Sequence, residues 1–133
     1  MINLKETKRL RDAIARFPLS YENIIEDTDL GVAVIDEKGV LVAVNNSYCS
    51  ILNYTRQELV GNHFSVLLPP DLKRISEINH TYFFKAKSSR LEKTEAVTKL
   101  QTRIKIFTDS FYISTPDKRS LKITFVSGYE EGS

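Results

Sequence analysis

The stretch IDEKGVLVAVNNSYCSILNY, residues 35–54, combines a polar turn, an apolar run and a pair of asparagines. The runs on either side of the turn, GVAVID (residues 31–36) and VLVAVN (residues 40–45), are short and rich in β-branched side chains, which favour strands. Gly39 lies in the turn and can take a positive φ without a Cβ clash. The pattern therefore predicts two adjacent antiparallel strands joined by a tight turn.

Asn45 and Asn46 are expected to end the second strand. Short amide side chains bond nearby backbone groups and cap helices well, so a turn or two of helix should follow over residues 47–53. Further along, Thr55 stands three residues before Glu58, which is the pattern of a capping box. We expect a second short helix to begin there.

Residues 2–17 are predicted to form an amphipathic helix with a narrow apolar stripe among basic side chains. Pro18 should end it, because proline removes an amide donor and restricts the residue before it. A further short helix is expected from Ser20 to Ile25. The stripe of the first helix consists of Leu4, Leu10, Ile14 and Phe17.

A longer helix is predicted from Asp71 to about Ala86, after Pro69 and Pro70 break the chain. Residues 87–93 are predicted to be a solvated connection. An angular step of about 100° per residue defines the face of this helix that should point inward. That face carries Leu72, Ile75, Asn79, Tyr82 and Phe83.

Three strands are expected in the rest of the chain, over residues 94–100, 102–114 and 120–128, with a bulge or a turn left open at residues 108–110. The whole order predicts an α+β fold: a five-stranded antiparallel sheet with short helices on one face, preceded by the amphipathic helix. We expect three parts: residues 1–19 as the N-terminal helix, 20–128 as the domain and 129–133 as a frayed tail.

Composition limits the classes of protein to which the chain can belong. A net charge of +2 does not call for nucleic acid or an anionic membrane as partner. A single cysteine, Cys49, rules out an internal disulfide and fits a reducing compartment. No apolar run approaches the roughly 20 residues that span a bilayer, and residues 1–11 lack the apolar centre of a signal peptide. We expect a soluble cytoplasmic domain.

The ordered series of elements, with the residues that mark it, resembles the PAS domain family from about Tyr21 to Gly128. Members typically show a strand, an Asp-x-x-Gly-like hairpin, a second strand ending in Asn, a short helix, and then a GY-(S/T)-x-x-E-L-x-G segment. LLPPDLK resembles the segment that opens the family's long helix, while Asn53 stands where glycine is usual. The charged-Gly turn between the third and fourth strands is missing. The matching positions are Asp36, Gly39, Asn45, Tyr54, Thr55, Glu58, Leu59 and Gly61.

The resemblance implies a sensory and interaction module of signal transduction that regulates an attached or associated output partner. It also implies a pocket between the inner face of the sheet and the helix beginning at Asp71, either holding a ligand or filled by side chains. Asn79 is informative, because an amide on an apolar helix face needs a partner. The candidate lining residues are Val34, Val42, Phe64, Leu67, Ile75, Asn79, Phe83, Ile104, Ile106, Ile123 and Phe125.

Single residues indicate which of the cofactors known in the family this chain is expected to bind. Haem-binding members carry a histidine on the long helix, but here Ser76 stands near that position and His80 is predicted at a solvent edge about 100° from the apolar face. Haem is therefore disfavoured, although a shift in register would bring His80 inward. Members that form a flavin adduct use a Gly-x-Asn-Cys stretch, and Phe64 replaces that cysteine, which excludes the adduct. The cofactor, if there is one, stays unknown.

No catalytic or metal-binding pattern is present. His63, His80 and Cys49 have no ligand spacing, and nucleophile-elbow, phosphate-loop and zinc-protease motifs are missing. The sequence predicts that the protein is not an enzyme. Two alternatives are kept: a sensor that binds haem or another cofactor, and a small pocket enzyme.

The N-terminal helix carries the second functional prediction. In the PAS family such helices often pack across the sheet of a second copy, so Leu4, Leu10, Ile14 and Phe17 are candidates for a homodimer interface. Packing of the helix on its own sheet is the competing interpretation. No kinase or cyclase fits within 133 residues, so the output partner is expected to be a further domain or a separate protein.

Overall fold

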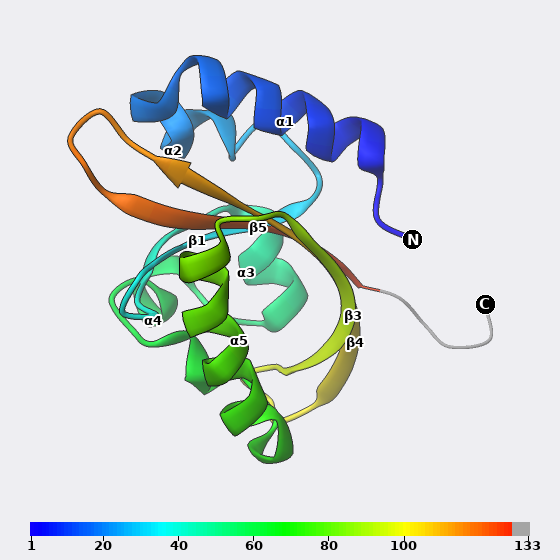
Figure 1. Ribbon diagram of the computed structural model, residues 1–133. Helices are drawn as coiled ribbons and strands as arrows, with labels where there is room; N and C mark the ends of the chain where they lie inside the picture. Colours follow the sequence, from blue (N-terminus) through cyan, green and yellow to red (C-terminus); the bar gives the residue numbers. More distant parts are fainter. Residues whose placement is uncertain (129–133) are drawn as a thin grey trace.

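A computed structural model describes residues 1–128 of the chain. Five antiparallel strands form one sheet in the order β2-β1-β5-β4-β3 (Figure 1). The predicted α+β fold with a five-stranded antiparallel sheet is confirmed. The strands are β1 (Gly31–Asp36), β2 (Leu41–Val44), β3 (Arg90–Val97), β4 (Arg103–Ser114) and β5 (Ser120–Gly128).

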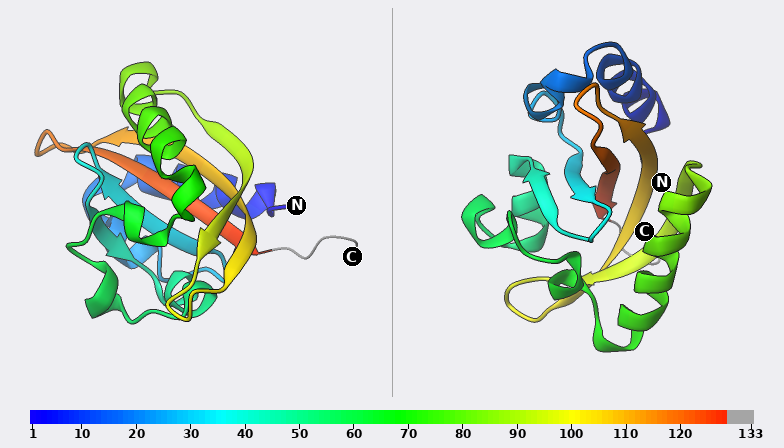
Figure 2. Two further views of the ribbon diagram at one scale, coloured as in Figure 1. Left: turned by 90° about the horizontal axis from the view of Figure 1, so that it is seen from below. Right: turned by 60° about the vertical axis from the view of Figure 1, so that its left-hand side comes forward.

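Helices cover both faces of the sheet. The N-terminal helices α1 and α2 lie on one face, which we call the outer face, and α3, α4 and α5 lie on the other, the inner face (Figures 1 and 2). Within residues 1–128, no helix is both long and apolar enough to cross a membrane. The helices are α1 (Leu4–Arg16), α2 (Tyr21–Ile24), α3 (Asn46–Leu52), α4 (Arg56–Leu59) and α5 (Lys73–Ala86), with 3-10 turns η1 (Pro18–Ser20), η2 (Phe64–Leu67) and η3 (Pro70–Leu72).

The sheet separates two apolar cores, because successive side chains of a strand point to opposite faces. On β1, Val32 and Val34 join the outer core under α1, whereas Ala33 and Ile35 join the inner core near α3 and η2. β1 is therefore buried on both faces, which explains why its sequence shows no polar alternation.

Asn45 links the strands to the helices, as the asparagine pair predicts. Its side-chain oxygen accepts from the backbone amides of Val32 and Tyr48, both at 2.9 Å, so it caps α3. Its amide nitrogen donates to the carbonyls of Ile25 at 2.6 Å and Leu30 at 2.9 Å. The side chain is 1% exposed, and these bonds satisfy its polar atoms.

Several predicted elements appear with their expected bounds. β1 and β5 have the bounds predicted from the sequence, and the capping box of Thr55 and Glu58 opens α4. The turn glycine Gly39 has a φ of 85°, and a Cβ there would collide with the ring of His63.

The second half of the chain differs from the prediction at two points. β3 begins at Arg90, whereas residues 87–93 were expected to be a connection. The first residues of this edge strand include several charged side chains and therefore did not predict a strand, since only one face of the strand contacts the core. β4 runs unbroken through residues 108–110, where a bulge or turn was left open. The predicted tail, residues 129–133, lies outside the described residues.

The rotation of α5 also differs from the prediction. Ile75 is 50% exposed and Tyr82 is 62% exposed, whereas His80 and Phe83 are buried. Both faces of this helix carry apolar side chains, so its sequence pattern is compatible with more than one rotation. Packing against the sheet selects the face that includes Asn79, His80 and Phe83.

Candidate functional site

A cavity of about 120 Å³ lies between α5, η2 and the inner face of the sheet. Its walls combine apolar side chains with polar ones, since strands β3, β4 and β5 present hydroxyl and charged side chains to it. The apolar part includes Ile35, Tyr48, Phe64, Leu67, Ala96, Ile106 and Val126, and the polar part includes Ser76, Asn79, Arg90, Glu92, Thr94, Thr108, Ser110, Lys122 and Thr124.

Lys122 is the unpaired charge of this cavity. Its ammonium lies 4.9 Å from the ring centroid of Phe83, and no ion pair joins it to any carboxylate in residues 1–128. Burial lowers the pKa of Lys122 below its ordinary value. By contrast, Arg90 and Glu92 pair with each other at 3.1 Å, and Glu95 pairs with Arg103 at 2.7 Å.

His80 is buried, so its predicted position at a solvent edge is wrong. The side chain is 7% exposed, and its Nε2 donates to the carbonyl oxygen of Glu37 in the β1–β2 turn at 3.0 Å. Nδ1 of the ring then carries no proton, and it has no hydrogen-bond partner in the described chain. Burial lowers the pKa of His80 below its ordinary value. The ring packs between Phe64 and Phe84, at centroid distances of 5.0 and 4.9 Å.

The cavity does not fit haem or a flavin. Pockets for drug-sized ligands measure about 300–1,000 Å³, well above the roughly 120 Å³ found here. His80 does not line the cavity, and its Nε2 is bound to the carbonyl of Glu37. In residues 1–128, no cluster of three His, Cys, Asp or Glu side chains could hold a metal ion.

The structure brings together part of the predicted pocket. Four of the candidates, Phe64, Leu67, Asn79 and Ile106, line the cavity. Two others lie close to this region without lining it. Ile104 packs against the inner core, and Phe83 is buried beside Lys122.

The remaining five candidates do not line the cavity. Ile75 is half exposed on α5, because the helix is rotated away from the predicted phase. Val34, Val42, Ile123 and Phe125 belong to the outer core or pack against it, under α1. We correct their assignment: the more apolar face of β5 is covered by the N-terminal helix, and the more polar face lines the cavity.

Sequence reasoning missed Lys122 and Thr124. Both alternate with the apolar positions Leu121, Ile123 and Phe125, and from the sequence Ile123 and Phe125 of this apolar face were assigned to the pocket. The apolar stripe of the N-terminal helix is the sequence feature that could have indicated these two residues. A helix that covers one face of the sheet leaves the opposite face of β5 for the cavity.

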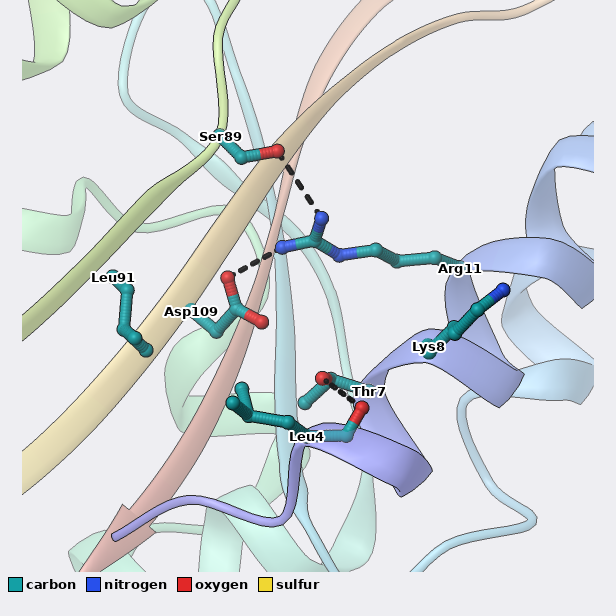
Figure 3. A pocket seen from close by; sticks show the side chains of 7 residues that line it. All are labelled: Leu4, Thr7, Lys8, Arg11, Ser89, Leu91 and Asp109. Carbon is teal, nitrogen blue, oxygen red and sulfur yellow. Dashed lines mark hydrogen bonds and ion pairs between the residues drawn. The ribbon is translucent and has the colours of Figure 1, made fainter.

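A second contact joins α1 to the outer face of β4 (Figure 3). The guanidinium of Arg11 donates to the buried carboxylate of Asp109 at 2.5 Å and to Ser89 Oγ at 3.1 Å. It also stacks over the ring of Phe111, 5.2 Å from the centroid. Arg11 Nε is buried without a partner in the described chain. Leu4 and Leu91 line a surface hollow of about 410 Å³ beside this ion pair.

The four candidates for a dimer interface separate into two pairs. Leu10 and Ile14 are fully buried in the outer core of their own chain, as in the competing interpretation. Leu4 is 46% exposed and Phe17 is 58% exposed, so only these two remain on the surface.

Comparison with known proteins agrees with this architecture. The family model described as PAS fold matches residues 19–124. No curated protein matches the chain. Among solved structures, the PAS domain of Bordetella pertussis BvgS has a TM-score of 0.70 at 15% identity, covering 86% of this chain and 88% of that one.

Two further structures show the same fold. The PAS domain of an HTR-like protein from Haloarcula marismortui has a TM-score of 0.69 at 14% identity, covering 96% of this chain and 100% of that one. A domain of a sensory box sensor histidine kinase/response regulator from Geobacter sulfurreducens has a TM-score of 0.64 at 20% identity, covering 80% and 91%. PAS domains are sensory modules of signal transduction and are generally not enzymes. With its sheet order, its Asn45-capped crossover and a family match over most of its length, the chain belongs to the PAS family.

Proposed function

We propose that this protein is a sensory and interaction module that communicates the state of its cavity to an output partner through the N-terminal helix. One observation carries the proposal: three consecutive residues of β4 serve both sites. Thr108 and Ser110 line the cavity, and Asp109 between them binds Arg11 of α1. We propose a regulatory rather than a catalytic role, in which this strand connects the cavity to the N-terminal helix.

The physical basis is the stiffness of a central strand. β4 pairs with both β3 and β5, so its residues cannot shift singly. A ligand that favours one position of Thr108 and Ser110 also favours one position of Asp109, and hence of Arg11. A ligand can shift the populations of two arrangements of β4 and α1 only if it binds one arrangement more tightly than the other, and the size of the shift is set by that difference in affinity.

Filling the cavity tests this coupling without a known ligand. In Thr108→Leu, we expect the ratio of the hydrogen-exchange rates of α1 amides to those of α3 amides to change by at least about threefold. Thr81→Leu, on the exposed side of α5, is the matched control and should leave the α1-to-α3 ratio unchanged. An unchanged ratio in a folded Thr108→Leu protein would contradict the proposal.

We further propose that two copies associate through α1, with the exposed Leu4 and Phe17 at a two-fold contact. This is supported by the exposure of both side chains at the two ends of α1, the helix that covers the outer face. Native mass spectrometry should show a dimer for the unmodified chain and a monomer for Leu4→Ser with Phe17→Ser. A monomer in the unmodified chain at micromolar concentration would refute it.

The setting we propose is the cytoplasm, with a signalling domain or protein as output partner and no direct contact with nucleic acid or membrane. The net charge of +2 and the single cysteine support this. Residues 20–128 would act as the sensory domain, with residues 1–19 as the helix that reports its state.

A further inference from the structure

Lys122 identifies the kind of ligand that the cavity can take. An ammonium drawn partly out of water without a counter-ion is unfavourable, and a bound anion would remove that cost. The charged and titratable groups nearest it are His80, Arg90 and Glu92. Glu92 attracts the Lys122 ammonium but pairs with Arg90, which repels it, so Lys122 forms no ion pair within residues 1–128.

Hydrogen-bond donors accompany this charge. Ser110 Oγ and Thr124 Oγ1 lie 3.0 Å apart, and since only one of them donates to the other, one hydroxyl proton stays free. The amide of Asn79 also lines the cavity and supplies further N–H donors. A ligand oxygen beside Lys122 would satisfy both kinds of donor.

Apolar side chains beside Lys122 would contact the other end of the ligand, since Ile35 on β1 pairs with Lys122 on β5 and Val126 lies on the same face of β5. Ile35, Leu67 and Val126 are buried aliphatic side chains that line the same cavity. A cavity of about 150 Å³ holds the six carbon atoms of benzene, so one of about 120 Å³ holds roughly five non-hydrogen atoms. Walls that combine polar and apolar side chains, together with this size, match a molecule with one charged end and a short hydrocarbon end.

We propose that the cavity binds a short-chain monocarboxylate, its carboxylate on Lys122 and its hydrocarbon end against Ile35, Leu67 and Val126. This rests on the proposed function, since it names the ligand class of the same sensory cavity. Inorganic phosphate matches the charge but not the aliphatic wall, and a neutral amide matches the wall but not the charge.

Three probes with the same number of non-hydrogen atoms distinguish these chemistries: propionate, propionamide and inorganic phosphate. Each is titrated into the full chain, with amide and methyl NMR shifts of residues lining the cavity as the readout. We expect saturable shifts with propionate and binding at least tenfold weaker with propionamide and with phosphate. Lys122→Met should weaken propionate binding at least tenfold, and Lys85→Met, on the exposed side of α5, should not change it.

Equal affinity for propionate and propionamide would overturn the anion class, and tighter binding of phosphate would overturn the carboxylate. Absence of saturable shifts with any probe would also overturn the proposal. The comparison of probes on the unmodified chain needs no variant, so a poorly folded Lys122→Met leaves the test intact. The exchange experiment on Thr108→Leu uses no ligand, so the proposed coupling can survive the failure of this ligand class.

Discussion

At the scale of single residues, Asn45 and His80 show how one side chain joins separate parts of the fold. Asn45 bonds the backbone of four residues from β1, α3 and the segment after α2. His80 fixes α5 to the β1–β2 turn through Glu37. Both side chains are buried, so the loss of either leaves polar backbone groups without water.

Asn45→Ala should lower the free energy of unfolding by about 3 kcal/mol or more, because two buried carbonyls and two buried amides lose their partner. Asn46→Ala is the matched control. Its side chain is exposed and bonds only Arg56, so we expect a loss below about 1 kcal/mol. Urea denaturation measures both. Similar losses in the two variants would show that the Asn45 network does not stabilise the fold.

The lowered pKa of His80 predicts a pH dependence. Its ordinary value is 6.5, and burial lowers the pKa in the folded state, so the unfolded chain binds the proton more readily. The free energy of unfolding should therefore be highest above pH 6.5 and fall as the pH drops below it, by less than about 1.4 kcal/mol per pH unit. Urea denaturation between about pH 7.5 and pH 5.5 measures this.

His80→Gln is the control for that experiment, since glutamine can still donate to Glu37 but does not titrate. The variant should show a flatter pH profile. Hydrogen bonds from Arg9 and Lys99 lower the pKa of Glu6 and of Glu58 to about 2. These two groups therefore change the free energy of unfolding only below about pH 4.5. Identical profiles for the two proteins above that range would exclude His80 as the cause.

At the scale of elements, α1 is attached to the sheet by apolar burial and by one ion pair. Leu10 and Ile14 are buried in the outer core, and Arg11 reaches Asp109 on β4. The Asp109 carboxylate is 6% exposed, so it depends on Arg11 more than a surface carboxylate would. α1 is thereby an integral part of the fold that keeps a polar contact to the strand lining the cavity.

Arg11→Met should destabilise the protein by roughly 3 kcal/mol, because it leaves the Asp109 charge buried and unpaired. Arg11→Met with Asp109→Asn should recover part of this loss, since the second change removes that charge. Thermal and urea unfolding of the two variants give the comparison. A double variant less stable than Arg11→Met alone would contradict the assignment of the loss to the unpaired charge.

At the scale of the whole molecule, the sheet divides the interior into an outer core that is filled and an inner region that retains a cavity. α1 fills the outer side with Leu10 and Ile14, while α5 covers the inner side with Asn79 and Phe83. The cavity and the contact with α1 are therefore on opposite faces of the sheet.

The volume of the cavity predicts that the purified protein is colourless. A space of about 120 Å³ admits neither haem nor a flavin, so no Soret or flavin absorption band is expected. An absorption spectrum of freshly purified protein checks this. A Soret band would show that the cavity expands and that His80 can leave Glu37.

The fold was predictable because its local signals agree with one another. The Gly39 turn, the Asn45 cap and the box of Thr55 and Glu58 each depend on contacts within a few residues, which sequence patterns record directly. The alternation of β5 likewise defined a strand with two distinct faces.

Which of those faces lines the cavity was decided only by tertiary packing. Alternation is symmetric: it separates Ile123 from Lys122 but does not say which partner covers each face. The rotation of α5, which buries His80 and exposes Ile75, is also undetermined where both helix faces carry apolar groups. Local hydrogen bonding is determined by neighbouring residues. The side of a sheet that a distant helix covers depends instead on how much apolar surface the whole folded chain buries.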